Sequence, residues 1–138
     1  MATYEYELDN IPKDARDREL WLQHAAGLIY FEDARQYAIN RIDGAEDEKT
    51  RANIVEGIND ALYGIMMIND GVTGHIENSE YAVNLETKVN LIKKSDSGFE
   101  IVDQVKLIES DGMCMAFHGW LEDGFGEVLV ATKKDENT

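Results

Sequence analysis

The stretch from Asn53 to Leu91, NIVEGINDALYGIMMINDGVTGHIENSEYAVNLETKVNL, changes the spacing of its apolar residues partway along. Up to residue 70 they recur every three or four positions, as on one face of a helix, at Ile54, Ile58, Ala61, Leu62, Ile65 and Ile68. After residue 80 they alternate with polar residues, as in a strand with one buried face, at Tyr81, Val83, Leu85, Val89 and Leu91. The stretch therefore predicts a helix over about 47–70, a strand over about 81–93 and an α+β fold.

A second amphipathic helix is predicted upstream, over about 14–43. This segment has no proline, a single glycine at Gly27 and mostly good helix formers. At 100° per residue its apolar side chains fall on one arc, which consists of Trp21, Leu22, Ala25, Leu28 and Ile29. Gln23 and Gly27 are expected on the opposite side. Because Asp43-Gly44 ends the segment, we expect the two helices to form a hairpin.

Turn residues divide the rest of the chain into further predicted strands. The turns Ser95-Asp96-Ser97-Gly98 and Ser110-Asp111-Gly112 precede strands expected over about 99–109 and 113–121, and Gly124 and Gly126 precede a further strand over about 127–132. Alternation of Tyr4, Tyr6 and Leu8 indicates an extra N-terminal strand, and 133–138 is expected to be a frayed tail. The prediction is a single domain, 1–138, in which the helical hairpin packs on one face of a three- to four-stranded antiparallel β-meander.

The charge of the chain restricts its partners. It has 13 basic and 28 acidic residues, for a formal net charge of −15. Nucleic-acid backbones and anionic membrane surfaces are repelled by such a field, so neither is an expected partner. The excess either serves solubility or steers the chain toward a basic protein partner. Cys114 is the only cysteine and the N-terminus lacks a basic region followed by an apolar run, which predicts a cytoplasmic protein.

Two acidic residues interrupt the apolar patterns. Tight turns place Asp103 in an inward row between Val89 and Gly119, where either a β-bulge at Val102-Asp103 turns it outward or a polar group lies between sheet and helices. Glu32 falls within the apolar arc of the first helix. If these two carboxylates met, they could hold a divalent cation or share a proton; otherwise both are structural polar groups.

No other motif indicates chemistry. His118 and Cys114 are four apart on a predicted strand, about 13 Å, which is too far to chelate one zinc ion. Glu56 and Asp60, at i and i+4, resemble in outline the acidic pairs that bind magnesium in all-helical nucleotide pyrophosphatases. Because that fold has no β-meander, a solvated acidic helix face is the better interpretation. No cofactor or resident metal is expected.

One apolar patch is predicted on the outer face of the meander. Ile92, Val102 and Trp120 would cluster there, away from the helices. Either the N-terminal arm covers them, or they form a protein interface, including that of a homodimer.

Two functions remain. The first is a small acidic, non-enzymatic interaction or regulatory protein that binds a basic partner, as inhibitors and immunity proteins of bacteria and phages do. The second is a small ligand- or metal-binding domain or hydrolase with a pocket between helices and sheet, formed by Glu32, Asp103 and His118.

Overall fold

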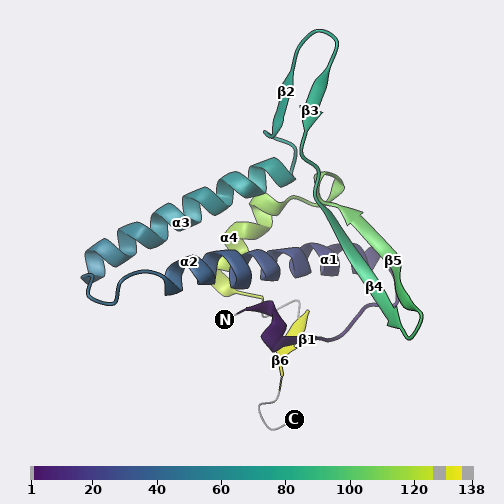
Figure 1. Cartoon of the computed structure of the whole chain (residues 1–138), viewed down its shortest axis with the longest axis horizontal. Coiled ribbons are helices and arrows are strands. Elements are labelled where there is room, and N and C mark those ends of the chain that lie inside the picture. The colour runs from purple at the N-terminus through teal and green to yellow at the C-terminus, as the bar shows by residue number, and fades with distance from the viewer. Residues whose placement is uncertain (1, 126–129, 135–138) are drawn as a thin grey trace.

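The computed structural model describes residues 2–125 and 130–134 and confirms the α+β class (Figure 1). Its helices are α1 (Ala15–Ile29), α2 (Gln36–Asn40), α3 (Glu48–Asn69) and α4 (Met113–Asp123). A π-helical turn, η2 (Tyr30–Arg35), joins α1 to α2, and two short 3-10 turns are η1 (Thr3–Glu5) and η3 (Leu107–Glu109). The two predicted helices, 14–43 and 47–70, are thus confirmed within a few residues.

Aspartates begin both long helices. The Asp14 carboxylate accepts from the backbone N–H of Arg16 at 2.7 Å, and that of Asp47 accepts from Thr50 at 2.7 Å. These bonds satisfy amide donors that have no partner within the helix. The α3 helix ends before Gly71, which has a φ of +78° and so provides the left-handed turn that a side chain disfavours.

The strands form three separate antiparallel pairs among the described residues, rather than one meander. β1 (Tyr6–Leu8) pairs with β6 (Ala131–Lys133), β2 (His75–Glu77) with β3 (Ala82–Asn84), and β4 (Lys88–Ser95) with β5 (Gly98–Lys106). The predicted N-terminal strand is therefore confirmed, and the predicted strand over 81–93 is divided between β3 and β4. Lys133 belongs to β6 instead of a frayed tail, while 126–129 and 135–138 lie outside the described residues.

The strand predicted over 113–121 is wrong, because this segment is the helix α4. Met113, Phe117 and Trp120 are buried at helical spacing. The Asp70 carboxylate, at the end of α3, accepts from the backbone N–H of Met113 at 2.7 Å and of Cys114 at 2.9 Å. A nine-residue apolar run does not distinguish a buried strand from a buried helix, and here a cap distant in sequence selects the helix.

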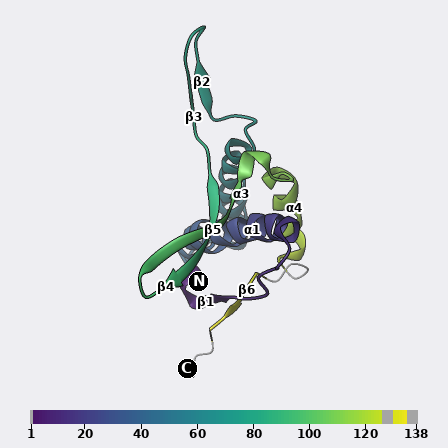
Figure 2. The same ribbon diagram turned by 90° about the vertical axis from the view of Figure 1, so that its right-hand side faces the viewer.

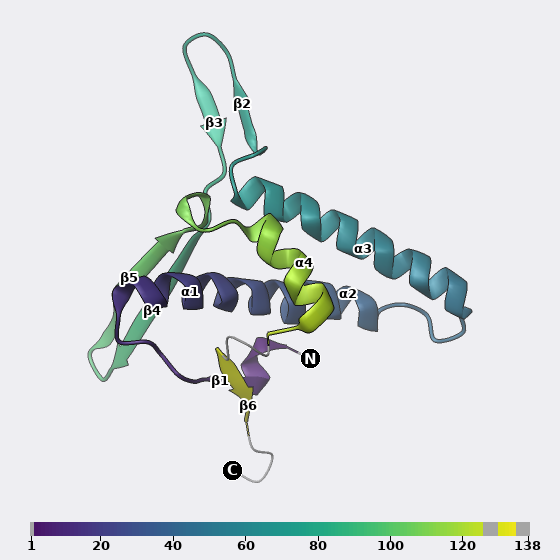
Figure 3. The same cartoon turned by 180° about the vertical axis from the view of Figure 1, so that it is seen from behind.

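The main core lies where α4 fills the space between the diverging helices α1 and α3 (Figures 1 and 3). Gly27 faces α4, because a Cβ on it would lie 2.4 Å from the Trp120 ring. Gln23 is also buried, and its Nε2 donates to the Gly112 carbonyl at 3.0 Å. The prediction that Gln23 and Gly27 face away from the core is therefore wrong, since α4 gives α1 a second buried side.

The β4–β5 hairpin packs its open end against α1. Val89 pairs with Val105 and both are buried, whereas Leu91 pairs with Asp103. The register then shifts, because Ile92 pairs with Ile101 and Val102 is left unpaired. The predicted bulge at Val102-Asp103 is thus confirmed, but the predicted opposition of Val89 and Asp103 is not. Gly119, the other predicted neighbour of Asp103, lies in α4.

The β2–β3 hairpin projects away from the helices, as the view from the side shows (Figure 2). Every residue of its two strands is exposed. Within the described part of the chain, no helix is long and apolar enough to cross a membrane.

Candidate functional site

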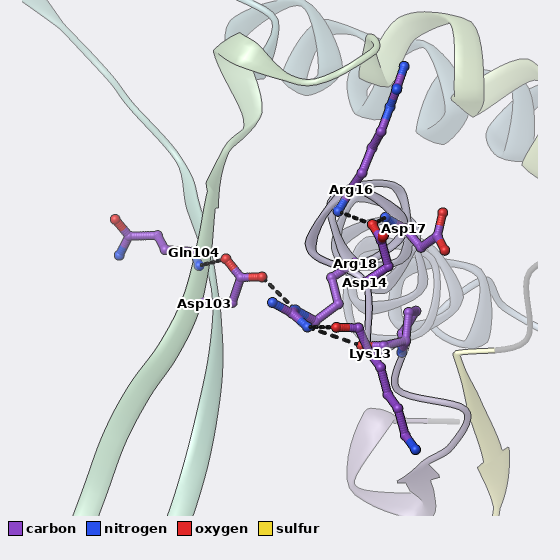
Figure 4. A network of polar contacts seen from close by, with 8 residues as sticks. Lys13, Asp14, Arg16, Asp17, Arg18, Asp103 and Gln104 are labelled. Carbon is purple, nitrogen blue, oxygen red and sulfur yellow. Dashed lines mark hydrogen bonds and ion pairs between the residues drawn. The ribbon is translucent and has the colours of Figure 1, made fainter.

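The start of α1 is fixed in place by a set of polar contacts with the preceding loop and with β5. Arg18 extends from α1 toward β5, where its Nε donates to Asp103 Oδ2 at 2.7 Å (Figure 4). Its Nη1 donates to the carbonyl of Lys13 at 2.8 Å and to that of Pro12 at 3.3 Å. The guanidinium is thus shared between the strand and the loop, which gives the first turns of α1 a defined position.

Asp103 is held as a carboxylate by this arrangement. The hydrogen bond from Arg18 lowers its pKa most, and the backbone N–H of Gln104, which donates at 2.8 Å, lowers it further. Asp103 therefore lies between sheet and helix, as one of the two predictions had it, and the bulge does not turn it away from α1. Because Arg18 neutralises it, we interpret Asp103 as a structural residue rather than a free acid.

Beside this junction lies a hollow of about 540 Å³, which we call the α1 hollow. Its lining consists of Pro12, Arg16, Asp17, Glu19, Leu20, Trp21 and Asp111. The three carboxylates are exposed and belong to two segments that are far apart in sequence. Arg16 is the only basic residue in the lining, and Pro12, Leu20 and Trp21 are its apolar members. The hollow therefore combines net negative charge with apolar surface.

Glu19 also borders a second, smaller hollow, of about 250 Å³, between α1 and β5. Asp103 and Glu109 line this one too, together with Lys106. Glu19 therefore lies between the two hollows and borders both. Trp21, beneath it, carries a buried Nε1 donor that has no partner within the described residues.

Glu32 lies on η2, far from Asp103. Arg18, which binds Asp103, precedes Glu32 by fourteen residues on one continuous helix, a distance of about 20 Å. Glu32 accepts from Tyr6 Oη at 3.1 Å, and its neighbour Asp33 accepts from the backbone N–H of Thr3 at 2.8 Å. The structure thus does not bring Glu32 and Asp103 together, and Glu32 holds the N-terminal segment against the π-helical turn.

His118 joins neither carboxylate. It is exposed on α4, and its ring lies 5.5 Å from that of Tyr63 on α3. The ligand-binding set predicted from Glu32, Asp103 and His118 is therefore dispersed over three parts of the fold. No group of three or more His, Cys, Asp or Glu side chains positioned for a metal ion occurs in the described ranges.

The predicted patch of Ile92, Val102 and Trp120 is also divided. Trp120 is 4% exposed and lies in the core, where its Nε1 donates to His24 Nδ1 at 2.8 Å. Ile92 and Val102 are each 47% exposed on the β4–β5 hairpin. The correction follows from the secondary structure, because a helix over 113–121 turns Trp120 inward against Gly27. The spacing of Met113, Phe117 and Trp120 was the signal that indicates a helix.

Cys114 is unsuited to nucleophilic catalysis. Burial raises the pKa of its thiol, and the nearby Asp70 carboxylate raises it further. A thiol with a raised pKa carries little reactive thiolate near neutral pH. Cys114 is therefore interpreted as part of the packing between α3 and α4.

Sequence reasoning missed the α1 hollow. Asp17 and Glu19 occur in a helix turn whose charge is ordinary for a solvated face, and Asp111 was assigned to a turn. Their convergence depends on the position of the loop before α4, which no local pattern encodes. No protein-family model, no curated protein and no solved structure matches the chain.

Proposed function

We propose that the chain is a non-enzymatic interaction protein that binds a basic segment of a partner protein at the α1 hollow. The observation that carries this proposal is the pairing of exposed carboxylates with an apolar lining at the start of α1, which the Arg18–Asp103 ion pair joins to β5. This function would place the chain in the same functional class as inhibitors and immunity proteins.

A lysine or arginine side chain suits such a surface in two respects. Its aliphatic stem packs on apolar groups such as Leu20 and Pro12, while its charged end reaches carboxylates. Asp17, Glu19 and Asp111 provide these carboxylates at the edge of the hollow. Because Arg18 and Asp103 already fix the start of α1, little ordering is needed when the partner arrives.

The charge of the whole chain supports the same partner. A net charge of −15 raises the local concentration of a basic protein and accelerates encounter. The competing function, a ligand-binding domain or hydrolase between helices and sheet, has less support, because its three expected side chains are dispersed and Asp103 is paired with Arg18.

A charge-matched comparison tests the proposal. One variant combines Asp17→Asn, Glu19→Gln and Asp111→Asn, and its control combines Glu77→Gln, Glu80→Gln and Glu100→Gln. All six side chains are exposed, and both variants lose three negative charges. The immobilised wild-type chain is expected to retain a basic protein from a source lysate at about 0.1 M salt. It should release that protein at about 1 M salt, where charges attract one another over about a third of the distance.

The control variant should retain the partner, and the hollow variant should lose it. Equal loss from both would show that net charge alone, and not the hollow, makes the interaction. Retention by the hollow variant, or equal binding at both salt concentrations, would contradict the proposal.

A further inference from the structure

The β2–β3 hairpin has one apolar face that none of residues 2–125 and 130–134 covers. Ile76 pairs with Val83, so their side chains lie on the same side, and alternation adds Tyr81 and Leu85 to that side. The exposed fractions of Ile76, Tyr81, Val83 and Leu85 are 80%, 73%, 68% and 66%. We call these four residues the hairpin face. Glu77, Ala82 and Asn84 belong to the opposite face.

This exposure conflicts with the sequence pattern. Residues 81–85 alternate as a half-buried strand does, yet the described part of the chain supplies no layer for them to pack on (Figure 2). A two-stranded hairpin with neither a third strand nor a packed face is marginally stable in water. A well-formed hairpin of this kind therefore points to a surface that another molecule covers.

Charge identifies the class of molecule. Residues 71–106, which contain both projecting hairpins, carry six acidic and four basic side chains, whereas the rest of the chain carries 22 and nine. Within 71–85 the only charged side chains are Glu77 and Glu80. A basic partner finds few carboxylates here. For two copies of a strongly acidic chain, by contrast, this nearly neutral region is where contact brings the fewest like charges together.

The extent of exposed surface is also appropriate for a second copy. The chain exposes 9799 Å², whereas a compact monomer of 15.6 kDa is expected to expose about 7,200 Å². The difference is about 2,600 Å², and obligate homodimers bury roughly 1,000 to 2,500 Å² on each protomer. The chain as a whole therefore exposes more surface than a compact monomer, by an amount near the upper end of the range that a homodimer buries on each protomer.

We propose that the hairpin face docks on the hairpin face of a second copy of this chain, around a two-fold axis. An apolar face without a charge on it is self-complementary, as a two-fold interface requires. The two hairpins stack as two layers about 10 Å apart, which is the spacing of packed sheets. This interface is distinct from the α1 hollow and goes beyond the proposed function.

Two lysine substitutions on opposite sides of one strand test the interface. Val83→Lys puts a cation in the hairpin face of both copies, and Asn84→Lys puts the same charge on the opposite face. Both native side chains are exposed, so neither substitution disturbs the core. Sedimentation of the purified full-length chains over a range of concentrations gives the dimer dissociation constant. If circular dichroism shows that Val83→Lys does not fold, Tyr81→Lys replaces it on the same face.

The wild type and Asn84→Lys are expected to sediment with twice the 15.6 kDa chain mass, and Val83→Lys to weaken the dimer at least about tenfold. A monomeric wild type, or equal dissociation constants for the two variants, would overturn the proposal. If the wild type were a monomer that captures a partner protein, and Val83→Lys abolished that capture, the hairpin face would bind a different protein. That outcome would also overturn the proposal. These sedimentation experiments use the purified chain alone. Their result therefore does not depend on whether the α1 hollow binds a partner protein.

Discussion

The helix α3 and the hairpin β2–β3 follow one another in the chain and are both amphipathic, but among the described residues only the apolar face of α3 is covered by other elements. Leu62 and Met66 of α3 are buried in the core, where α3 packs against α4. Val83 and Leu85 of the hairpin are exposed. The difference shows that the spacing of apolar residues identifies which face of a helix or strand becomes buried. It does not identify the element or molecule that buries that face. For the hairpin, we infer that the cover is a second copy.

The largest expected effect separates the hairpin from the core that covers α3, by truncating one aromatic residue in each. Trp120→Ala should destabilise the fold by about 3–5 kcal/mol, because it leaves a cavity against Gly27 and removes the hydrogen bond to His24. Tyr81→Ala should change the stability of the monomer by less than about 0.5 kcal/mol, since its side chain is exposed.

Urea unfolding at a protein concentration below the dimer dissociation constant measures both changes. Equal destabilisation by the two substitutions would show that the hairpin is packed like the core, and it would contradict the comparison.

A smaller effect is expected from two glycine substitutions. Gly27→Ala should cost about 1–3 kcal/mol, because the added Cβ overlaps the Trp120 ring at 2.4 Å. Gly57→Ala on α3 has open space around its Cβ and should stabilise the helix by about 0.5–1 kcal/mol. Thermal unfolding of the two variants should shift in opposite directions. A neutral Gly27→Ala would show that Trp120 of α4 does not lie as close to α1 as the 2.4 Å approach requires.

The smallest expected effect is a pH dependence of the stability of the core, which arises from His24. Burial lowers the pKa of His24 below its ordinary 6.5, and its Nδ1 accepts from Trp120 only when unprotonated. The folded chain binds this proton less readily than the unfolded chain does. The contribution to stability is therefore complete above pH 6.5 and is lost as the pH falls through the lowered value.

Each unit of pKa lowering corresponds to about 1.4 kcal/mol. His24→Asn keeps an acceptor for the Trp120 N–H without a titrating ring, so this variant should lose part of the slope of stability between pH 7 and pH 5, a window set by the usual titration range of histidine near 6.5. An unchanged slope would remove His24 as its cause.

Local patterns predicted the elements that are long and strongly periodic. The helices α1 and α3 follow from 3.6-residue periodicity over many turns, whereas the bulge at Val102 was predicted as a way to turn Asp103 outward and Asp103 instead faces Arg18. Residues 113–121 were ambiguous, because a short apolar run suits either structure and the deciding cap, Asp70, lies 43 residues away.

The candidate site was less predictable than the fold. Asp103 was identified as unusual, but its partner Arg18 lies 85 residues away and no pattern links the two. The α1 hollow depends on the loop before α4, which brings Asp111 beside Asp17 and Glu19. Glu32 interrupted the apolar arc because a π-helical turn directs it toward Tyr6, and a regular helical wheel does not represent such a turn.

The most direct test is hydrogen exchange of the wild type at two protein concentrations, one below and one above the dimer dissociation constant. It shows whether the core is stable within a single chain while the hairpin is stabilised only in the dimer. The amides of α1 and α4 should be equally protected at both, because their packing is internal. Those of β2 and β3 should exchange rapidly in the dilute sample and slowly in the concentrated one. Hairpin amides as protected as those of α1 at the lower concentration, or unchanged between the two, would contradict the account.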